Sequence, residues 1–123
     1  MSADPELPMF IRRHFNSVWA LEIMLLLRAR QERGWRVDEL VREMRASQAL
    51  VAANLAAFER AGLATREADE TFRFAPATPL LAELCRQVAE AYRDRPVAVI
   101  NLIAAPEDRL QQLAEAFRFT PPR

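Results

Sequence analysis

The chain has 123 residues, of which 51% are hydrophobic and 28% charged, a composition typical of one globular domain and not of a disordered chain. Seventeen arginines balance seventeen acidic residues, and this zero net charge excludes the strongly basic composition of a simple phosphate-binding domain. The single cysteine, Cys85, excludes an internal disulfide framework, and the single histidine, His14, excludes a histidine-pair zinc site.

Signatures of targeting and catalysis are not found in the sequence. Residues 1–10 are acidic and contain prolines, so we expect no signal peptide, and the longest strongly apolar run, residues 23–27, is too short to cross a bilayer. These features predict a cytoplasmic protein. No GxGxxG, Walker-type or GxSxG motif and no metal-ligand set occurs, so we predict a protein that is not an enzyme and has no cofactor or metal.

The first predicted helix covers residues 16–33, with Asn16 or Ser17 as its N-cap and Gly34 placed to end it. Its apolar residues occupy most of the helix circumference, so the helix needs to be covered on more than one side. A central core helix explains this pattern. A helix that also contributes to a dimer interface explains it as well.

A second helix is predicted over residues 37–44, where two acidic residues in the first turn interact favourably with the helix dipole. After a short turn at residues 45–46, Ser47 is expected to cap a third helix that ends at Ala61. The predicted core face of this third helix consists of Val51, Leu55 and Phe58. Gly62 is expected to follow in the left-handed conformation.

The hydrophobic pattern then changes to a period of two. Residues 63–67 and 71–75 flank a short turn, and Phe72 and Phe74 alternate with more polar or smaller residues. This alternation predicts a β-hairpin with one buried face, which Pro76 ends.

The order of these elements, together with a few short motifs, resembles that of a known family. The motifs are Val37-Asp38-Glu39-Leu40, the Ser47 cap, the helix close at Leu55, Phe58, Gly62 and Leu63, and the exit Arg73-Phe74-Ala75-Pro76. Over residues 17–76 the chain resembles the winged helix-turn-helix domain of small bacterial transcriptional regulators of the MarR and ArsR type. The resemblance implies a mainly α fold with a small β-hairpin, the wing.

Three further helices are predicted after the wing. The first covers residues 79–94 after a Thr78 cap, the second follows Pro96 over residues 97–104, and the third begins at residues 106–108. The inward residues of the first are predicted to be Leu80, Leu81, Leu84, Val88 and Ala91, and those of the third Leu110, Leu113, Ala114 and Phe117. We therefore predict a single domain over residues 1–123, with a winged-helix core at 17–76 and C-terminal helices at 77–123.

Helices beyond the wing usually dimerise the related regulators, so the resemblance implies a homodimer. Crowded apolar residues in the first helix and after the wing support this prediction, because leaving them in water is unfavourable. The predicted dimerisation residues are Ile23, Leu26, Leu27, Val97, Ile100 and Ile103.

The resemblance also implies that the third helix enters the major groove of double-stranded DNA, while the wing touches the backbone or the minor groove. At the start of that helix, Ser47 and Gln48 would reach phosphate or a base edge, and Ala49 or Ala53 would touch a thymine methyl group. Basic residues bordering the same surface complete the predicted DNA-binding set, and these are Arg45, Arg66 and Arg73.

Charge favours an alternative. Residues 37–76 contain five arginines and seven acidic residues, a net charge of −2 where DNA binding requires positive charge. The alanine-rich outer face of the third helix would also suit packing against another protein. Two hypotheses therefore stand: a homodimeric DNA-binding transcriptional regulator, and a winged-helix protein-interaction module that does not bind DNA.

Overall fold

The computed structural model describes residues 6–105 and divides into two compact units. One unit comprises Trp19–Ala82. The other combines Met1–Val18 with Glu83–Arg123, of which residues 6–18 and 83–105 are described. The predicted last helix, with Leu110, Leu113, Ala114 and Phe117, lies outside the described residues, and the single-domain organisation stays a prediction.

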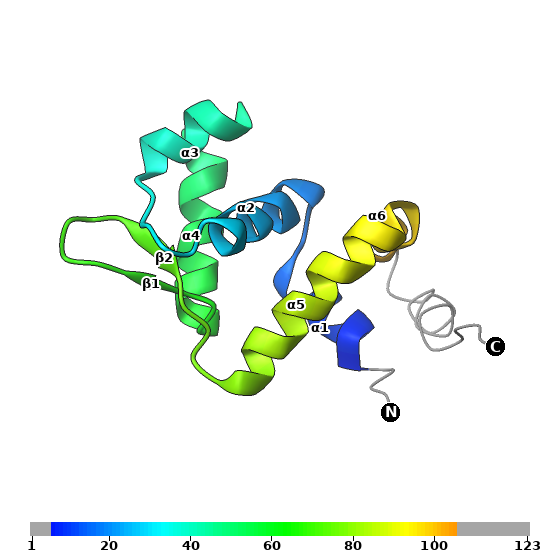
Figure 1. Ribbon diagram of the computed structural model, residues 1–123. Helices are drawn as coiled ribbons and strands as arrows, with labels where there is room; N and C mark the ends of the chain where they lie inside the picture. Colours follow the sequence, from blue (N-terminus) through cyan, green and yellow to red (C-terminus); the bar gives the residue numbers. More distant parts are fainter. Residues whose placement is uncertain (1–5, 106–123) are drawn as a thin grey trace. The chain divides into compact units, whose positions relative to one another are not determined.

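The Trp19–Ala82 unit contains a helix-turn-helix followed by a hairpin (Figure 1). Its helices are α2 (Val18–Ala29), α3 (Val37–Met44) and α4 (Gln48–Ala61), and its strands are β1 (Ala64–Arg66) and β2 (Phe72–Phe74). Both α3 and β1 pack against α4. Val51, Leu55 and Phe58 of α4 are at most 1% exposed, which confirms the predicted core face of this helix.

Local capping interactions begin and end α4 where the sequence predicts. The Ser47 hydroxyl accepts a hydrogen bond from the Leu50 N–H at 3.1 Å. At the other end Gly62 has φ of +80°, its N–H donates to the Glu59 carbonyl at 3.2 Å, and the Leu63 N–H donates to the Phe58 carbonyl at 2.9 Å. This is a Schellman motif, which satisfies carbonyls that the helix end leaves free.

The hairpin is antiparallel, and Ala64, Thr65 and Arg66 pair with Phe74, Arg73 and Phe72 respectively. Phe72 and Phe74 are buried, which confirms the predicted alternation. The sequence did not predict a further bridge, in which Trp35 and Phe72 exchange two backbone hydrogen bonds of 2.8 Å each. The segment before α3 is thereby attached to the edge of the hairpin.

The prediction that Gly34 ends the first helix is wrong. The helix ends at Ala29, and a turn follows before Gly34. A Cβ atom at position 34 would lie 2.5 Å from Thr71 Oγ1, closer than atoms can approach. Gly34 therefore permits the chain to pass close to the hairpin while the neighbouring Trp35 bridges to Phe72.

The other unit contains α1 (Glu6–His14), part of α5 (Pro79–Asp94) and α6 (Pro96–Ala104). The sequence did not predict α1, which packs against α6. The Arg12 guanidinium donates to the carbonyl oxygens of Leu102, Ile103 and Ala105, where α6 leaves carbonyls without helical partners. Burial of His14, together with the neighbouring Arg13, lowers the pKa of its imidazole.

Helices α5 and α6 begin and end where the sequence predicts, with the Thr78 hydroxyl accepting from the Leu81 N–H at 3.1 Å. Leu84, Cys85 and Val88 are buried, and Leu81 and Ala91 are half-buried. The prediction that Leu80 faces inward is wrong, since it is 53% exposed. It lies in the first turn of α5, at the edge of the buried stripe.

Over the described residues the chain is thus mainly α with a small β-hairpin wing: a winged helix-turn-helix with additional C-terminal helices. Within the same residues, no helix is both long and apolar enough to cross a membrane.

Candidate nucleic-acid interface

The turn between α3 and α4 places five of the predicted DNA-contacting residues at an exposed end of α4. Arg45, in this turn, has a left-handed backbone conformation with φ of 55°. The exposed residues are Arg45, Ser47, Gln48, Ala49 and Ala53. Free N–H groups and the positive end of the helix dipole meet at a helix N-terminus, so this end of α4 is suited to a phosphate oxygen.

A surface groove of about 430 Å³ lies beside this end of α4. Its lining comes from the start of α3, from α4 and from the hairpin, and consists of Arg36, Val37, Asp38, Gln48, Ala52, Arg66, Glu70 and Phe72. The groove brings together Gln48 and Arg66, two residues of the predicted set that are 18 positions apart in the sequence. The lining of the groove does not include other residues of the predicted set, among them Arg45, Ala49, Ala53 and Arg73.

Arg66 at the end of β1 is the basic residue of the wing that faces this groove. Its guanidinium lies 3.3 Å from the Glu70 carboxylate and 3.6 Å from that of Glu59, and 4.9 Å from the centre of the Phe72 ring. Its side chain remains 44% exposed and that of Glu70 70% exposed. Ion pairs this exposed contribute only about 0–1 kcal/mol to stability, so Arg66 is available to a competing anion.

Arg73 on β2 has a different environment. Its guanidinium forms two hydrogen bonds with the Glu67 carboxylate, at 3.0 and 3.2 Å, and a third with the Gln31 carbonyl at 3.3 Å. The hydrogen bonds that Arg73 donates to the Glu67 carboxylate are the main cause of its raised pKa. The predicted phosphate contact of Arg73 therefore competes with three contacts that connect the wing to the segment after α2.

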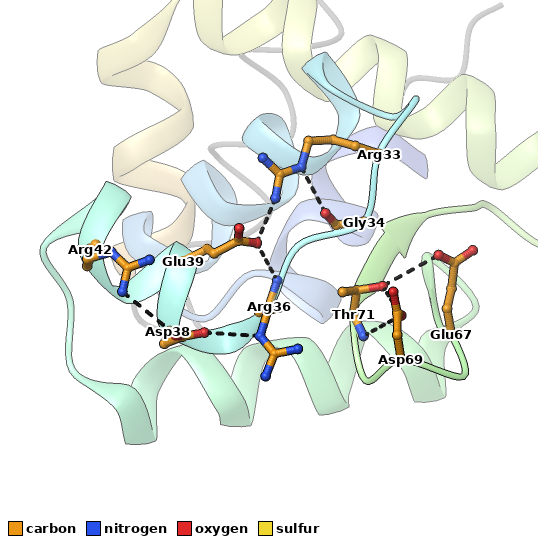
Figure 2. Close-up of polar contacts among 9 residues, drawn as sticks. All are labelled: Arg33, Gly34, Arg36, Asp38, Glu39, Arg42, Glu67, Asp69 and Thr71. Atoms are coloured by element: carbon orange, nitrogen blue, oxygen red, sulfur yellow. Dashed lines mark hydrogen bonds and ion pairs between the residues drawn. The ribbon is translucent and has the colours of Figure 1, made fainter.

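The turn of the wing is acidic. Figure 2 shows Thr71 beside Glu67 and Asp69, and its hydroxyl donates to the Asp69 carboxylate at 2.6 Å. Hydrogen bonds from Thr71 lower the pKa of Asp69, which keeps this carboxylate charged. Glu70 follows with φ of 67°, a left-handed conformation that residues with a Cβ rarely adopt.

Ion pairs also occupy the arginines around the start of α3 (Figure 2). Arg33 lies 2.6 Å from Glu39, and both Arg36 and Arg42 lie 3.7 Å from Asp38. Among the described residues of the Trp19–Ala82 unit, four arginines have no ion pair, and these are Arg28, Arg30, Arg45 and Arg60. Of the predicted DNA-binding arginines, Arg45 alone is in that group.

The outer face of α4 carries methyl groups. Ala49, Ala52 and Ala53 are exposed, and Ala56 and Ala57 are half-buried. The Asn54 amide donates to the Leu50 carbonyl of its own helix at 2.9 Å. The Gln48 amide has no hydrogen bond to any of the described residues, so in the first turns of α4 it is the side chain that can reach a base edge.

The predicted dimerisation residues differ in exposure. Ile23 and Leu27 are 0% and 1% exposed, so the single chain already covers them. Leu26, Ile100 and Ile103 are half-buried. Val97 on α6 is 68% exposed, the largest exposure of any large apolar side chain in the described part of the chain.

Comparisons with protein-family models, with curated protein sequences and with solved structures find no match to this chain.

Sequence reasoning did not find Arg36, Ala52 and Glu70, which line the groove. A helical wheel could have placed Ala52 beside Gln48, because the two residues are four positions apart on one face. No sequence pattern places Arg36 or Glu70 there, since both positions depend on how the hairpin packs beside α4.

Proposed function

We propose that this chain is a winged helix-turn-helix transcriptional regulator that binds double-stranded DNA as a homodimer, in the manner of the bacterial MarR and ArsR-type proteins it resembles. The observation that carries the proposal is the shared groove, which brings Gln48 of α4 and Arg66 of the wing to one surface. A recognition helix and a wing that face the same concavity can contact adjacent parts of one duplex.

In this proposal the N-terminal half of α4 enters the major groove. The uncommitted amide of Gln48 pairs with a base edge, and the methyl groups of Ala49 and Ala53 contact thymine methyl groups. Arg45, exposed and without an ion pair in the described part of the chain, contacts a phosphate together with the free N–H groups beside Ser47.

A titration with random duplex DNA at several salt concentrations tests DNA binding. We expect weak non-specific binding whose logarithmic affinity falls linearly with the logarithm of salt concentration, because bound phosphates release counterions. Arg45→Ala should reduce the slope by about 0.9 per subunit bound, the value for one phosphate contact. Arg30→Ala is the matched control, because it removes an arginine just after α2 that has no ion pair with the described residues. Equal slopes for the two variants would contradict the role of Arg45.

Sedimentation at micromolar concentration tests the homodimer. We expect a mass of twice 14.1 kDa that decreases on dilution, with Val97→Glu shifting the equilibrium towards the monomer. Leu80→Glu places the same charge at another exposed apolar position, outside α6, and is the control. A monomer at every concentration would contradict the dimer and the two-fold operator that it implies.

The acidic wing favours the second candidate, a protein-interaction module that does not bind DNA. Glu59, Glu67 and Glu70 neutralise both wing arginines, and residues 37–76 have a net charge of −2. Complete absence of DNA binding at low salt would favour this candidate over the regulator.

A further inference from the structure

We infer that Glu70 limits the DNA affinity of this protein by holding the Arg66 guanidinium, so that Arg66 is a phosphate contact only when it leaves this carboxylate. The inference depends on the proposed DNA-binding function and assigns a role to a residue outside the predicted contact set.

The two side chains lie where a DNA backbone would pass in the proposed complex. Both Arg66 and Glu70 line the groove that also contains Gln48 and Ala52 of α4. A duplex whose bases reach Gln48 would therefore place phosphates near the hairpin. Glu70 would then act twice, since its carboxylate occupies Arg66 and also repels the phosphate itself.

Exchange of Arg66 from Glu70 to a phosphate needs little rearrangement. The closest approach of the pair is 3.3 Å, and the side chains of Arg66 and Glu70 are 44% and 70% exposed. On exchange the Glu70 carboxylate becomes fully hydrated, and the guanidinium keeps an anionic partner with a geometry that suits it. Glu59, at 3.6 Å, is a second and more distant carboxylate partner.

Arg73 provides the contrast within the same hairpin. Its three hydrogen bonds reach Glu67 and the Gln31 carbonyl, and its side chain is 32% exposed against 44% for Arg66. Release of Arg73 would leave the Gln31 carbonyl without this donor and remove one of the contacts between the wing and the segment after α2. We therefore assign Arg73 to the structure of the wing and Arg66 to DNA.

The backbone supports a specific role for Glu70. With φ of 67°, position 70 has the conformation that glycine and asparagine adopt most readily in turns. A carboxylate is nevertheless held at this turn position, four residues after Arg66. Its ion pair with Arg66 is the contact that the structure shows for this side chain.

The test compares Glu70→Gln with Glu43→Gln in salt titrations against random duplex DNA. Both variants remove one negative charge and hardly change the volume of the side chain. They differ in that Glu43, exposed on α3, forms no ion pair with the described residues, whereas Glu70 pairs with Arg66. We expect Glu70→Gln to raise affinity by about three- to tenfold at 50 mM salt and to steepen the salt slope by about 0.9 per bound subunit. Glu43→Gln should change the affinity less and leave the slope unaltered.

Arg66→Ala, combined with Glu70→Gln and separately with Glu43→Gln, completes the test. If Glu70 acts through Arg66, the gain from Glu70→Gln shrinks to the direct charge effect and the steeper salt slope is lost when Arg66 is alanine, while the effect of Glu43→Gln persists. Equal effects of the two glutamine variants, or a gain in affinity and slope that is undiminished without Arg66, would overturn the inference and leave the proposed function intact. Failure of the natural chain and of Glu70→Gln to bind DNA at any salt concentration would overturn both.

Discussion

Phe58→Ala is expected to lower the free energy of unfolding by about 3–5 kcal/mol, the largest effect that we predict for a single substitution. Phe58 is 1% exposed and lies on the same face of α4 as Val51 and Leu55, both fully buried. Removal of the ring loses its transfer free energy and leaves a cavity that the surrounding structure fills only in part.

Urea unfolding followed by far-ultraviolet circular dichroism measures this loss. Arg60→Ala, two residues further along the same helix and exposed, is the control and should change the free energy of unfolding by no more than about 0.5 kcal/mol. If Phe58→Ala unfolds at the same urea concentration as the natural chain, the assignment of Phe58 to the core is wrong.

Gly34→Ala is expected to cost about 1–3 kcal/mol, the range for inserting a methyl group into a packed site. The new Cβ would lie 2.5 Å from Thr71 Oγ1 and 2.8 Å from Thr71 Cβ. The chain cannot easily move away, because the next residue, Trp35, forms two backbone hydrogen bonds with Phe72. Relief of the clash therefore requires either the bridge or the hairpin to shift.

Thermal unfolding of a double-mutant cycle with Thr71→Gly identifies the cause of this loss. Because Thr71→Gly removes both clashing atoms, Gly34→Ala should cost less in that background than in the natural chain. The same cost in both backgrounds would show that the destabilisation does not come from Thr71. A melting temperature unchanged by Gly34→Ala alone would contradict the close approach itself.

The candidate site was predictable only in part. Residues at the start of α4 could be found from the sequence, because the Ser47 cap and the helix period place Gln48, Ala49 and Ala53 on accessible positions. The ion-pair partners of the arginines could not be predicted from the sequence. Composition gives the numbers of acidic and basic residues, whereas the partners of Arg66 and Arg73 depend on the hairpin register and on the segment after α2.

The sequence by itself determined α3, α4 and the buried face of the hairpin, since Ser47, Gly62 and the alternation of Phe72 and Phe74 act over a few residues. Tertiary structure alone decided the end of α2, the formation of α1 and the pairing of the wing arginines. Contacts between distant parts of the chain accompany each of these: Gly34 with Thr71 after the end of α2, Arg12 with the end of α6, and Arg73 with Gln31. Local propensity carries no information about such contacts, because their free energy is gained only when the chain has folded.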